Sequence, residues 1–231
     1  MRRAPSATGQ ARIRVAGVGS GGRTAVNGLI AAGVGGVEFL TIDTDAAALR
    51  ESRAPLHLCL GQLASGAAGD PERGRRAALA SQAMLEAALG GADLVFVLAG
   101  LAGGTGSGAA PVVAQVAREQ GALVIAMVTY PFSFEGRSRK QTAERGIHGL
   151  KKWADTLIVI PNDRLIKLAD GRFGFHETYR LAHDVWRQSI QGISDVVNRP
   201  GLINVDFADV RTIMAEGGAA VIATGSGRGP D

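Results

Sequence analysis

Short apolar runs, each dense in valine, isoleucine or leucine, recur along the chain with helix-like stretches between them. The runs are nearly continuous, which is typical of strands buried on both faces of a parallel sheet. Because strands that alternate with helices form parallel crossover units, the pattern predicts a doubly wound α/β fold with a mainly parallel sheet. The predicted strands are RIRVAGV, VEFLTID, ADLVFVLAG, ALVIAMVTY, DTLIVIP and AAVIATG, and the predicted helices cover about 24–33, 72–89, 108–120 and 138–152.

A long amphipathic helix is predicted after these units, in HETYRLAHDVWRQSIQGISDVVNR, with Pro200 ending it. Its apolar positions recur at helical spacing and predict one buried face, formed by Trp186, Ile190, Ile193 and Val197. A short helix capped by Asp206 should follow, with its apolar side chains turned inward. These are Val210, Ile213 and Met214.

The composition bounds the class of protein. A chain of 231 residues that is 46% hydrophobic and 20% charged suits one large globular domain. It has no apolar run of the roughly 20 residues that a membrane span needs, and its start, MRRAPSATGQ, lacks the apolar core of a signal peptide, so we expect a cytoplasmic protein with no membrane insertion. The single cysteine, Cys59, has no ligand cluster near it, which predicts no metal site. The arginines are scattered and not interleaved with aromatic residues, so no nucleic-acid partner is expected.

The first glycine-rich loop, in AGVGSGGRTAVNGLI, follows the first predicted strand. Gly17, Gly19 and Gly22 match the dinucleotide-binding pattern G-x-G-x-x-G, and Asp43 lies about 20 residues further on, where such sites place a ribose-binding carboxylate. A tight turn between strand and helix alone also demands glycines. The loop by itself therefore leaves a nicotinamide-dependent oxidoreductase and other phosphate-binding proteins open.

Two further loops favour a polyphosphate ligand. The segment LAGGTGSGAAP joins a predicted strand to a helix, and its glycines, Thr105 and Ser107 would gather at the helix N-terminus, where anions bind. The segment ASGAAGDPERG has the same character, with Pro71 at a first helical position. Loops at the carboxyl ends of parallel strands lie along one edge of the sheet, so we expect the three to converge. The Walker pattern G-x-x-x-x-G-K-[ST] is absent from the sequence.

The segment AGGTGSG resembles the tubulin signature G-G-G-T-G-[ST]-G, and the sequence around it looks like FtsZ, the bacterial tubulin homologue of cell division. The resemblance continues through DTLIVIPNDRL, QGISD and RPGLINVDFADVRTIM, from about residue 10 to 226. It implies the Rossmann-like topology of the tubulin/FtsZ GTPases with a long central helix, GTP or GDP with Mg²⁺, head-to-tail filaments, and a role in division at the division site. The oxidoreductase alternative has no hydride-transfer constellation to support it.

The resemblance assigns nucleotide-binding roles to residues spread along the chain. The phosphates would be held by the first loop and the signature loop, the sugar by Glu135, Arg139 and Asn162, and the guanine base by Tyr179 and Asp184. The implied binding residues are Gly19, Ser20, Gly21, Gly22, Thr24, Asp43, Gly103, Gly104, Thr105, Gly106, Ser107, Glu135, Arg139, Asn162, Tyr179, His183 and Asp184. Taken without the resemblance, Glu135 and Arg139 would form a surface ion pair, and Asp184 would be a solvated charge.

The resemblance also implies catalysis shared between subunits. In the family, the segment NVDFAD acts on the nucleotide of the next subunit, so Asn204, Asp206 and Asp209 are the predicted catalytic residues. The two carboxylates would position the attacking water. As a local alternative, Asp206 and Asp209 cap a helix and interact with its dipole.

Several positions depart from the family pattern. Arg23 and Thr24 stand in the first loop where relatives have glycine and asparagine, and Asp43 replaces an asparagine, which adds a negative charge near the phosphates. Ala68 and Ala102 replace glycines of the third loop and the signature, and His183 replaces an asparagine. We expect altered affinity or turnover.

Family members continue into a second domain beyond AAVIATG. We therefore expect a flexible tail over residues 1–10, a GTP-binding domain over 11–178, the central helix with the catalytic loop and following helix over 179–216, and the start of a truncated second domain over 217–231. Two functions follow: a GTPase that hydrolyses GTP on self-assembly, or a short non-catalytic regulator that binds GTP and co-assembles with a full-length FtsZ homologue.

Overall fold

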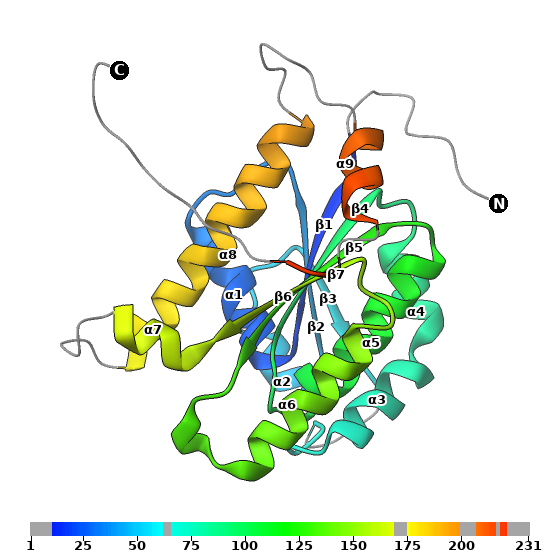
Figure 1. The fold of residues 1–231 in the computed structure, drawn as a ribbon. Coiled ribbons are helices and arrows are strands. Elements are labelled where there is room, and N and C mark those ends of the chain that lie inside the picture. Colours follow the sequence, from blue (N-terminus) through cyan, green and yellow to red (C-terminus); the bar gives the residue numbers. More distant parts are fainter. Residues whose placement is uncertain (1–10, 62–65, 169–174, 199–206, 216–217, 221–231) are drawn as a thin grey trace, which may run out of the picture.

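The computed structural model describes residues 11–61, 66–168, 175–198, 207–215 and 218–220 of the chain (Figure 1). Its strands are β1 (Ile13–Val18), β2 (Glu38–Asp43), β3 (Leu56–Cys59), β4 (Leu94–Gly100), β5 (Leu123–Tyr130), β6 (Thr156–Pro161) and β7 (Gly218–Ala219). Its helices are α1 (Gly19–Ala31), α2 (Ala46–Leu49), α3 (Pro71–Ala80), α4 (Gln82–Leu89), α5 (Gly104–Glu119), the 3-10 turn η1 (Ser133–Glu135), α6 (Arg137–Leu150), α7 (Asn162–Leu168), α8 (Phe175–Asn198) and α9 (Phe207–Met214).

The strands form one sheet in the order β3-β2-β1-β4-β5-β6-β7. Every pair of neighbours among the described strands is parallel. This confirms the predicted doubly wound α/β fold. Because all strands run the same way, the loops that leave their carboxyl ends lie along one edge of the sheet.

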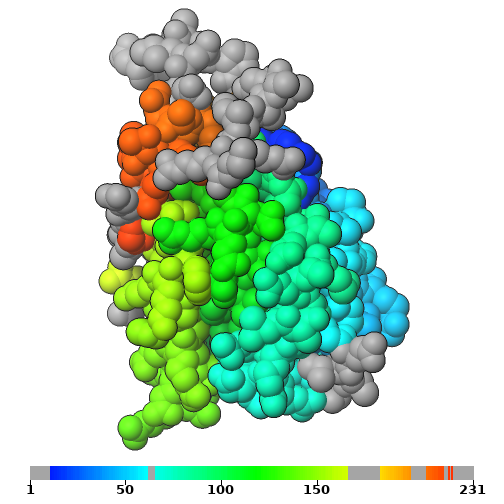
Figure 2. Space-filling model, turned by 90° about the vertical axis from the view of Figure 1, so that its right-hand side faces the viewer, coloured from blue at the N-terminus to red at the C-terminus, as the bar shows by residue number. Residues whose placement is uncertain are grey.

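Helices cover both faces of the sheet (Figure 1). The face covered by α3 to α6 is built on small side chains such as Ala16, Ala99 and Ala126, and Figure 2 shows these helices side by side over it. The other face, covered by α1, α7 and α8, buries larger side chains such as Phe96 and Met127. Successive strand residues thus point to opposite cores, which explains the continuous apolar runs. Among the described helices, none is long and apolar enough to cross a membrane.

The glycine loops form the first turns of helices. α1 begins at Gly19, five residues before the predicted start, and α5 begins at Gly104, four residues before it. A Cβ added at Gly22 would lie 2.3 Å from the Leu98 carbonyl oxygen, so glycine is required for α1 to pack directly on β4. Glycine is a poor helix former in isolation, and tertiary packing overrides that preference here.

The predicted helix 72–89 is wrong, because it is two helices that meet at Ser81. Ser81 has the non-helical angles φ −107° and ψ 19°, and its buried hydroxyl accepts a hydrogen bond of 2.9 Å from the Gly61 amide. A contact with a residue far away in sequence therefore sets the break. Sequence analysis also missed the edge strand β3, whose Leu56 and His57 are exposed and give no continuous apolar run.

The long helix is confirmed as α8, with Trp186 and Ile190 buried against the larger-residue core. In α9, Met214 packs on the same core, but the predicted inward position of Ile213 is wrong, because its side chain is 78% exposed. The start of the last predicted strand is β7, which pairs with β6 at the edge of the same sheet. Residues 1–10, 221–231 and Pro200 lie outside the described part of the chain. The division into domains stays a prediction.

Candidate functional site

Three loops at the carboxyl edge of the sheet surround a hollow of about 250 Å³. They are the start of α1, the signature loop that enters α5, and the third loop before α3, and they are joined there by the residues that follow β2. The lining residues are Ser20, Asp43, Thr44, Asp45, Ala48, Gly66, Ala67, Ala68, Gly69, Gly100, Gly103, Gly104, Thr105 and Gly106. The predicted convergence of the three glycine loops is therefore what the structure shows.

A larger depression of about 440 Å³ lies along α6 and is lined by Gln141, Glu144, Arg145 and His148. All four described lining residues come from one helix. The smaller hollow is the better candidate site, because separate elements converge on it.

The Thr44 hydroxyl ties the three segments of the hollow together. It lies 2.7 Å from the Thr105 hydroxyl of the signature loop and accepts a hydrogen bond of 2.9 Å from the Ala67 amide of the third loop. The Ser107 hydroxyl is also engaged, since it accepts a hydrogen bond of 2.8 Å from the Ala102 amide. Ser107 is buried outside the lining of the hollow, so in this structure it shapes the signature loop.

The amino end of α5 points its backbone at the hollow. The first amide bonded within the helix is that of Ser107, which donates to the Gly103 carbonyl at 3.1 Å. The amides of Gly104, Thr105 and Gly106 precede it and have no acceptor within the helix, yet all three residues line the hollow. These amides and the positive end of the helix dipole favour an anion at this place.

Gly103 and Gly104, neighbours in the signature loop, differ in how much space a side chain would have. A Cβ added at Gly104 would lie 2.8 Å from both the Ala67 Cβ and the Asp70 amide nitrogen, so this glycine lets the third loop pack closely. A Cβ added at Gly103 would meet no atom within 4 Å. Gly103 lines the hollow, and a side chain there would enter open space without disturbing the fold.

The hollow carries negative side chains. Its described lining includes Asp43 and Asp45 but neither lysine nor arginine. Burial raises the pKa of Asp43, and the Asp45 carboxylate raises it further, whereas hydrogen bonds from the amides of Thr44 and Asp45 lower it. An anionic ligand must therefore rely on backbone amides and on a cation that it brings with it.

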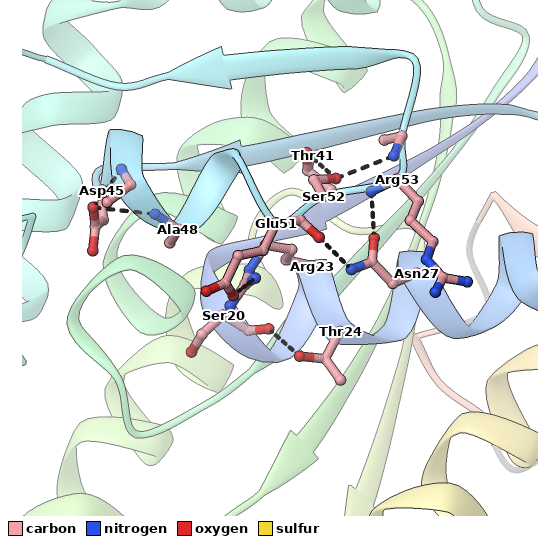
Figure 3. Close-up of polar contacts among 12 residues, drawn as sticks. Ser20, Arg23, Thr24, Asn27, Thr41, Asp45, Ala48, Glu51, Ser52 and Arg53 are labelled. Carbon is pink, nitrogen blue, oxygen red and sulfur yellow. Dashed lines mark hydrogen bonds and ion pairs between the residues drawn. The ribbon is translucent and has the colours of Figure 1, made fainter.

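Arg23 is held outside the hollow. It projects from α1 and forms an ion pair with Glu51, while Asn27, one turn further along, donates 2.9 Å to the Glu51 carbonyl and accepts from the Arg53 amide (Figure 3). The Arg23 side chain is 14% exposed, and its Nε has no hydrogen-bond partner. In this structure Arg23 fastens α1 to the segment between α2 and β3. The predicted binding residue Thr24 donates to the Ser20 carbonyl.

The residues expected around the sugar lie beyond the described hollow. Glu135 and Arg139 form an ion pair of 3.0 Å, and Glu135 also accepts from the Phe132 amide. This is the surface pair that their spacing predicts without the resemblance. Asn162 at the start of α7 is 4% exposed, and its Oδ1 has no hydrogen-bond partner. A buried amide oxygen of this kind calls for a donor, which a ligand hydroxyl would supply.

The residues expected around the base lie on α8. His183 is half-buried, stacks on Trp186 with 5.8 Å between ring centroids, and faces Gly28 of α1. Asp184 is exposed and forms an ion pair of 3.4 Å with Arg187. The side chain of Tyr179 lies outside the described residues.

Asp209, the described residue of the predicted catalytic segment, lies near the opposite edge of the sheet. Asp209 is exposed in the first turn of α9, and Arg211 of the same helix donates to the carbonyls of Gly121 and Asp93, which precede β5 and β4. The hollow lies beyond the other ends of the strands, since Gly100 and Asp43, the last residues of β4 and β2, line it. Asn204 and Asp206 lie outside the described residues.

Among the predicted binding residues, the described hollow includes Ser20, Asp43, Gly103, Gly104, Thr105 and Gly106. Gly19, Gly21 and Gly22 instead form the turn behind it, packed on the signature loop and β4. Thr44 and Asp45 line the hollow but were not predicted. Their signal was available in TIDTD, because polar residues directly after a parallel strand lie at the carboxyl edge.

Comparisons with known proteins agree with this geometry. The model of the Tubulin/FtsZ family, GTPase domain, matches residues 12–170. The chain is similar to a chain of an FtsZ dimer from M. jannaschii, described as empty, with 38% identity and a TM-score of 0.85 over 91% of this chain and 62% of that one. It therefore spans a little under two thirds of that relative.

More distant structures share the fold. CetZ2 from Haloferax volcanii, described as a GTPγS-bound protofilament, is 24% identical with a TM-score of 0.76, and the match covers 90% of this chain and 64% of that one. CetZ from Methanosaeta thermophila is 22% identical with a TM-score of 0.75 over 89% and 60% of the two chains. The matching model describes a GTPase domain, so it favours the phosphate-binding interpretation of the first glycine loop over the dinucleotide interpretation. With the converging glycine loops, the parallel sheet and the match over most of its length, this chain belongs to the tubulin/FtsZ family.

Proposed function

We propose that the hollow binds the phosphates of GTP or GDP, and that the chain is an FtsZ-like GTPase that acts in bacterial cell division, in the cytoplasm and at the division site. The observation that carries the proposal is the amino end of α5, where the backbone of Gly104, Thr105 and Gly106 lines a hollow built from three loops. Family membership supports guanine as the base. The exposed Asp184 carboxylate is the proposed acceptor for its N1–H and amino group.

Mg²⁺ is the proposed companion of the phosphates. The described residues contain no group of three or more His, Cys, Asp or Glu side chains that would hold a metal ion by themselves. The hollow does suit a ligand that brings its own cation, because its described lining carries carboxylates and no basic side chain. The ion would supply charge compensation on the phosphates, and we assign no protein ligand to it.

Calorimetric titration with GTP, GDP, ATP and NAD tests the binding site. We expect guanine nucleotides to bind at least about tenfold more tightly than ATP, because a site built to hydrogen-bond one base leaves polar groups unpaired with another. Gly103→Val should weaken GTP binding at least about tenfold, because Gly103 lines the hollow and a Cβ built on it meets no protein atom within 4 Å.

The matched control is Gly35→Val. A Cβ at Gly35 also meets no atom within 4 Å, but this glycine lies in the turn between α1 and β2. Gly35→Val should bind GTP like the parent chain. Equal binding of ATP and GTP would contradict the guanine site, and unchanged binding by Gly103→Val would contradict the placement of the phosphates.

Hydrolysis is proposed to need two subunits. Asp209 lies at the amino ends of the strands and the hollow at their carboxyl ends, so the carboxylate of one subunit would act on the nucleotide of the next in a head-to-tail contact. The described relatives support self-association, since one is a dimer and another a protofilament.

A second candidate function is a non-catalytic regulator that binds GTP and co-assembles with a full-length FtsZ homologue. The observation in its favour is Asp43, a buried carboxylate in the hollow, because its charge opposes a triphosphate. The GTPase and the regulator can be distinguished by adding the chain to a full-length FtsZ and measuring GTP turnover. A regulator changes turnover of the mixture while having none alone.

A further inference from the structure

The Asp43 carboxyl group lies where it interacts electrostatically with any charged ligand in the hollow. It is the last residue of β2, lines the hollow and is only 5% exposed. Its Oδ1 accepts hydrogen bonds from the Thr44 amide at 2.7 Å and from the Asp45 amide at 3.4 Å. The carboxyl group is therefore fixed in position, with little water to screen its charge.

The described residues around Asp43 offer it no cation. Asp45 follows it in the chain, and Cys59 stands opposite it in the register of β3. On the α5 side the Thr105 hydroxyl forms a hydrogen bond with the Asp43 carboxylate that lowers its pKa, and the third loop contributes only glycine and alanine to the described lining. Arg23, the basic residue of the first loop, is committed to Glu51. Every ionisable group that faces Asp43 in the described structure is thus an acid or a thiol.

The ionisable side chains described around Asp43 therefore disfavour its charged form. Burial raises the pKa of the Asp43 carboxyl group and of the Cys59 thiol, and negative charge of the neighbouring aspartates raises both further. A bound phosphate adds more negative charge beside Asp43, so it shifts that pKa upward again. Ligand binding and protonation of Asp43 must then favour each other, because coupling between two binding events is reciprocal.

We propose that Asp43 is a specificity-determining residue that sets the charge state of the complex: the phosphate ligand is bound together with one proton on this carboxyl group. Oδ1 already accepts from two amides, so the proton is assigned to Oδ2, and it removes the charge that would repel a phosphate oxygen. The inference rests on the proposed phosphate site. Its direction is fixed: affinity rises as pH falls toward the pKa of Asp43 in the complex and weakens above it.

Calorimetric titration with GDP in EDTA, between about pH 5.5 and 8, tests the coupling. Each titration is repeated in buffers of different ionisation enthalpy, so that the protons taken up on binding are counted. Asp43→Asn keeps the shape of the side chain and removes its charge. We expect this variant to bind GDP at least about tenfold more tightly at pH 8, to lose proton uptake, and to converge with the parent affinity at the acidic end.

Two comparisons make the result specific. The phosphates of GDP titrate in the same range for both proteins, so the difference between the parent and Asp43→Asn isolates Asp43. Glu38→Gln removes one negative charge from the opposite end of β2, where Glu38 pairs with Arg14, and should leave proton uptake unchanged.

The outcomes separate the two proposals. Parallel pH profiles for the parent and Asp43→Asn, with equal proton uptake, overturn the role of Asp43 and leave the nucleotide site standing. A chain in which neither protein binds GDP, while circular dichroism shows both folded, overturns the nucleotide site and with it this inference.

Discussion

Ala102 has a backbone φ of 108°, in the left-handed region that costs an alanine about 1–2 kcal/mol. It stands at the first position of the signature loop, and its amide donates a hydrogen bond to the Ser107 hydroxyl. We expect Ala102→Gly to raise the free energy of unfolding by about 1 kcal/mol, because relief of strain exceeds the entropy that glycine adds to the unfolded chain. Urea denaturation followed by circular dichroism measures this change.

Ala109→Gly is the control for Ala102→Gly. Ala109 is buried in the regular part of α5, so glycine there should lower the free energy of unfolding by about 1 kcal/mol. Ala68 also has a positive φ, of 48°, which lies in the better tolerated part of the left-handed region. Ala68→Gly should therefore raise the free energy of unfolding by less than Ala102→Gly does. If Ala102→Gly destabilises the chain as much as Ala109→Gly does, the signature loop stores no strain.

At the scale of elements, Arg211 joins α9 to the sheet, together with the apolar contacts of Phe207 and Met214. Its guanidinium donates to the Gly121 and Asp93 carbonyls at 3.0 and 3.1 Å and lies over the Phe207 ring at 5.4 Å. Arg211→Ala should cost about 1–2 kcal/mol, and hydrogen exchange should show protection lost first in α9. Arg211→Lys should resemble the alanine variant, because an ammonium group lacks the planar fork that bridges two carbonyls.

The control for this element is Arg187→Ala. Arg187 forms an exposed ion pair with Asp184 on α8, a type of contact that contributes little to stability. Because Asp209 shares α9 with Arg211, loosening the helix should lower GTP turnover while nucleotide affinity stays within about twofold. Full protection of α9 in Arg211→Ala would mean that its apolar contacts alone hold it.

At the scale of the whole molecule, the sheet separates the proposed catalytic carboxylate from the proposed phosphate site. β4 alone, seven residues long, spans about 20 Å between the two edges. Turnover per subunit should therefore rise with protein concentration. Asp209→Ala should abolish turnover and leave GTP affinity within about twofold, as measured by phosphate release and calorimetry, while Glu144→Ala, which removes an exposed carboxylate from α6, should change neither.

Mixing variants tests the sharing of the site directly. Asp209→Ala still binds GTP, and Gly103→Val still carries Asp209, so a mixture of the two inactive proteins should regain turnover. Concentration-independent turnover that survives Asp209→Ala would contradict the two-subunit site. Absence of turnover at every concentration, with GTP bound, would favour the regulator.

Much of this architecture could be predicted from sequence because it depends on local periodicity. The central strands read as continuous apolar runs because the two cores lie on either side of them, and α8 reads as one apolar stripe because only one of its faces is buried. The convergence of the three glycine loops also followed, since parallel strands leave their carboxyl ends at one edge.

Only the tertiary structure decided the features that join residues far apart in the chain. The break at Ser81 depends on the Gly61 amide, the edge strand β3 on its pairing with β2, and the exposure of Ile213 on how α9 lies against the sheet. The ion pair of Arg23 with Glu51 and the acidic surroundings of Asp43 also depend on contacts that only the folded structure brings about. A sequence fixes which side chains are available, but charge and hydrogen bonding act over a few ångströms in space, so contacts across the fold determine what each side chain does.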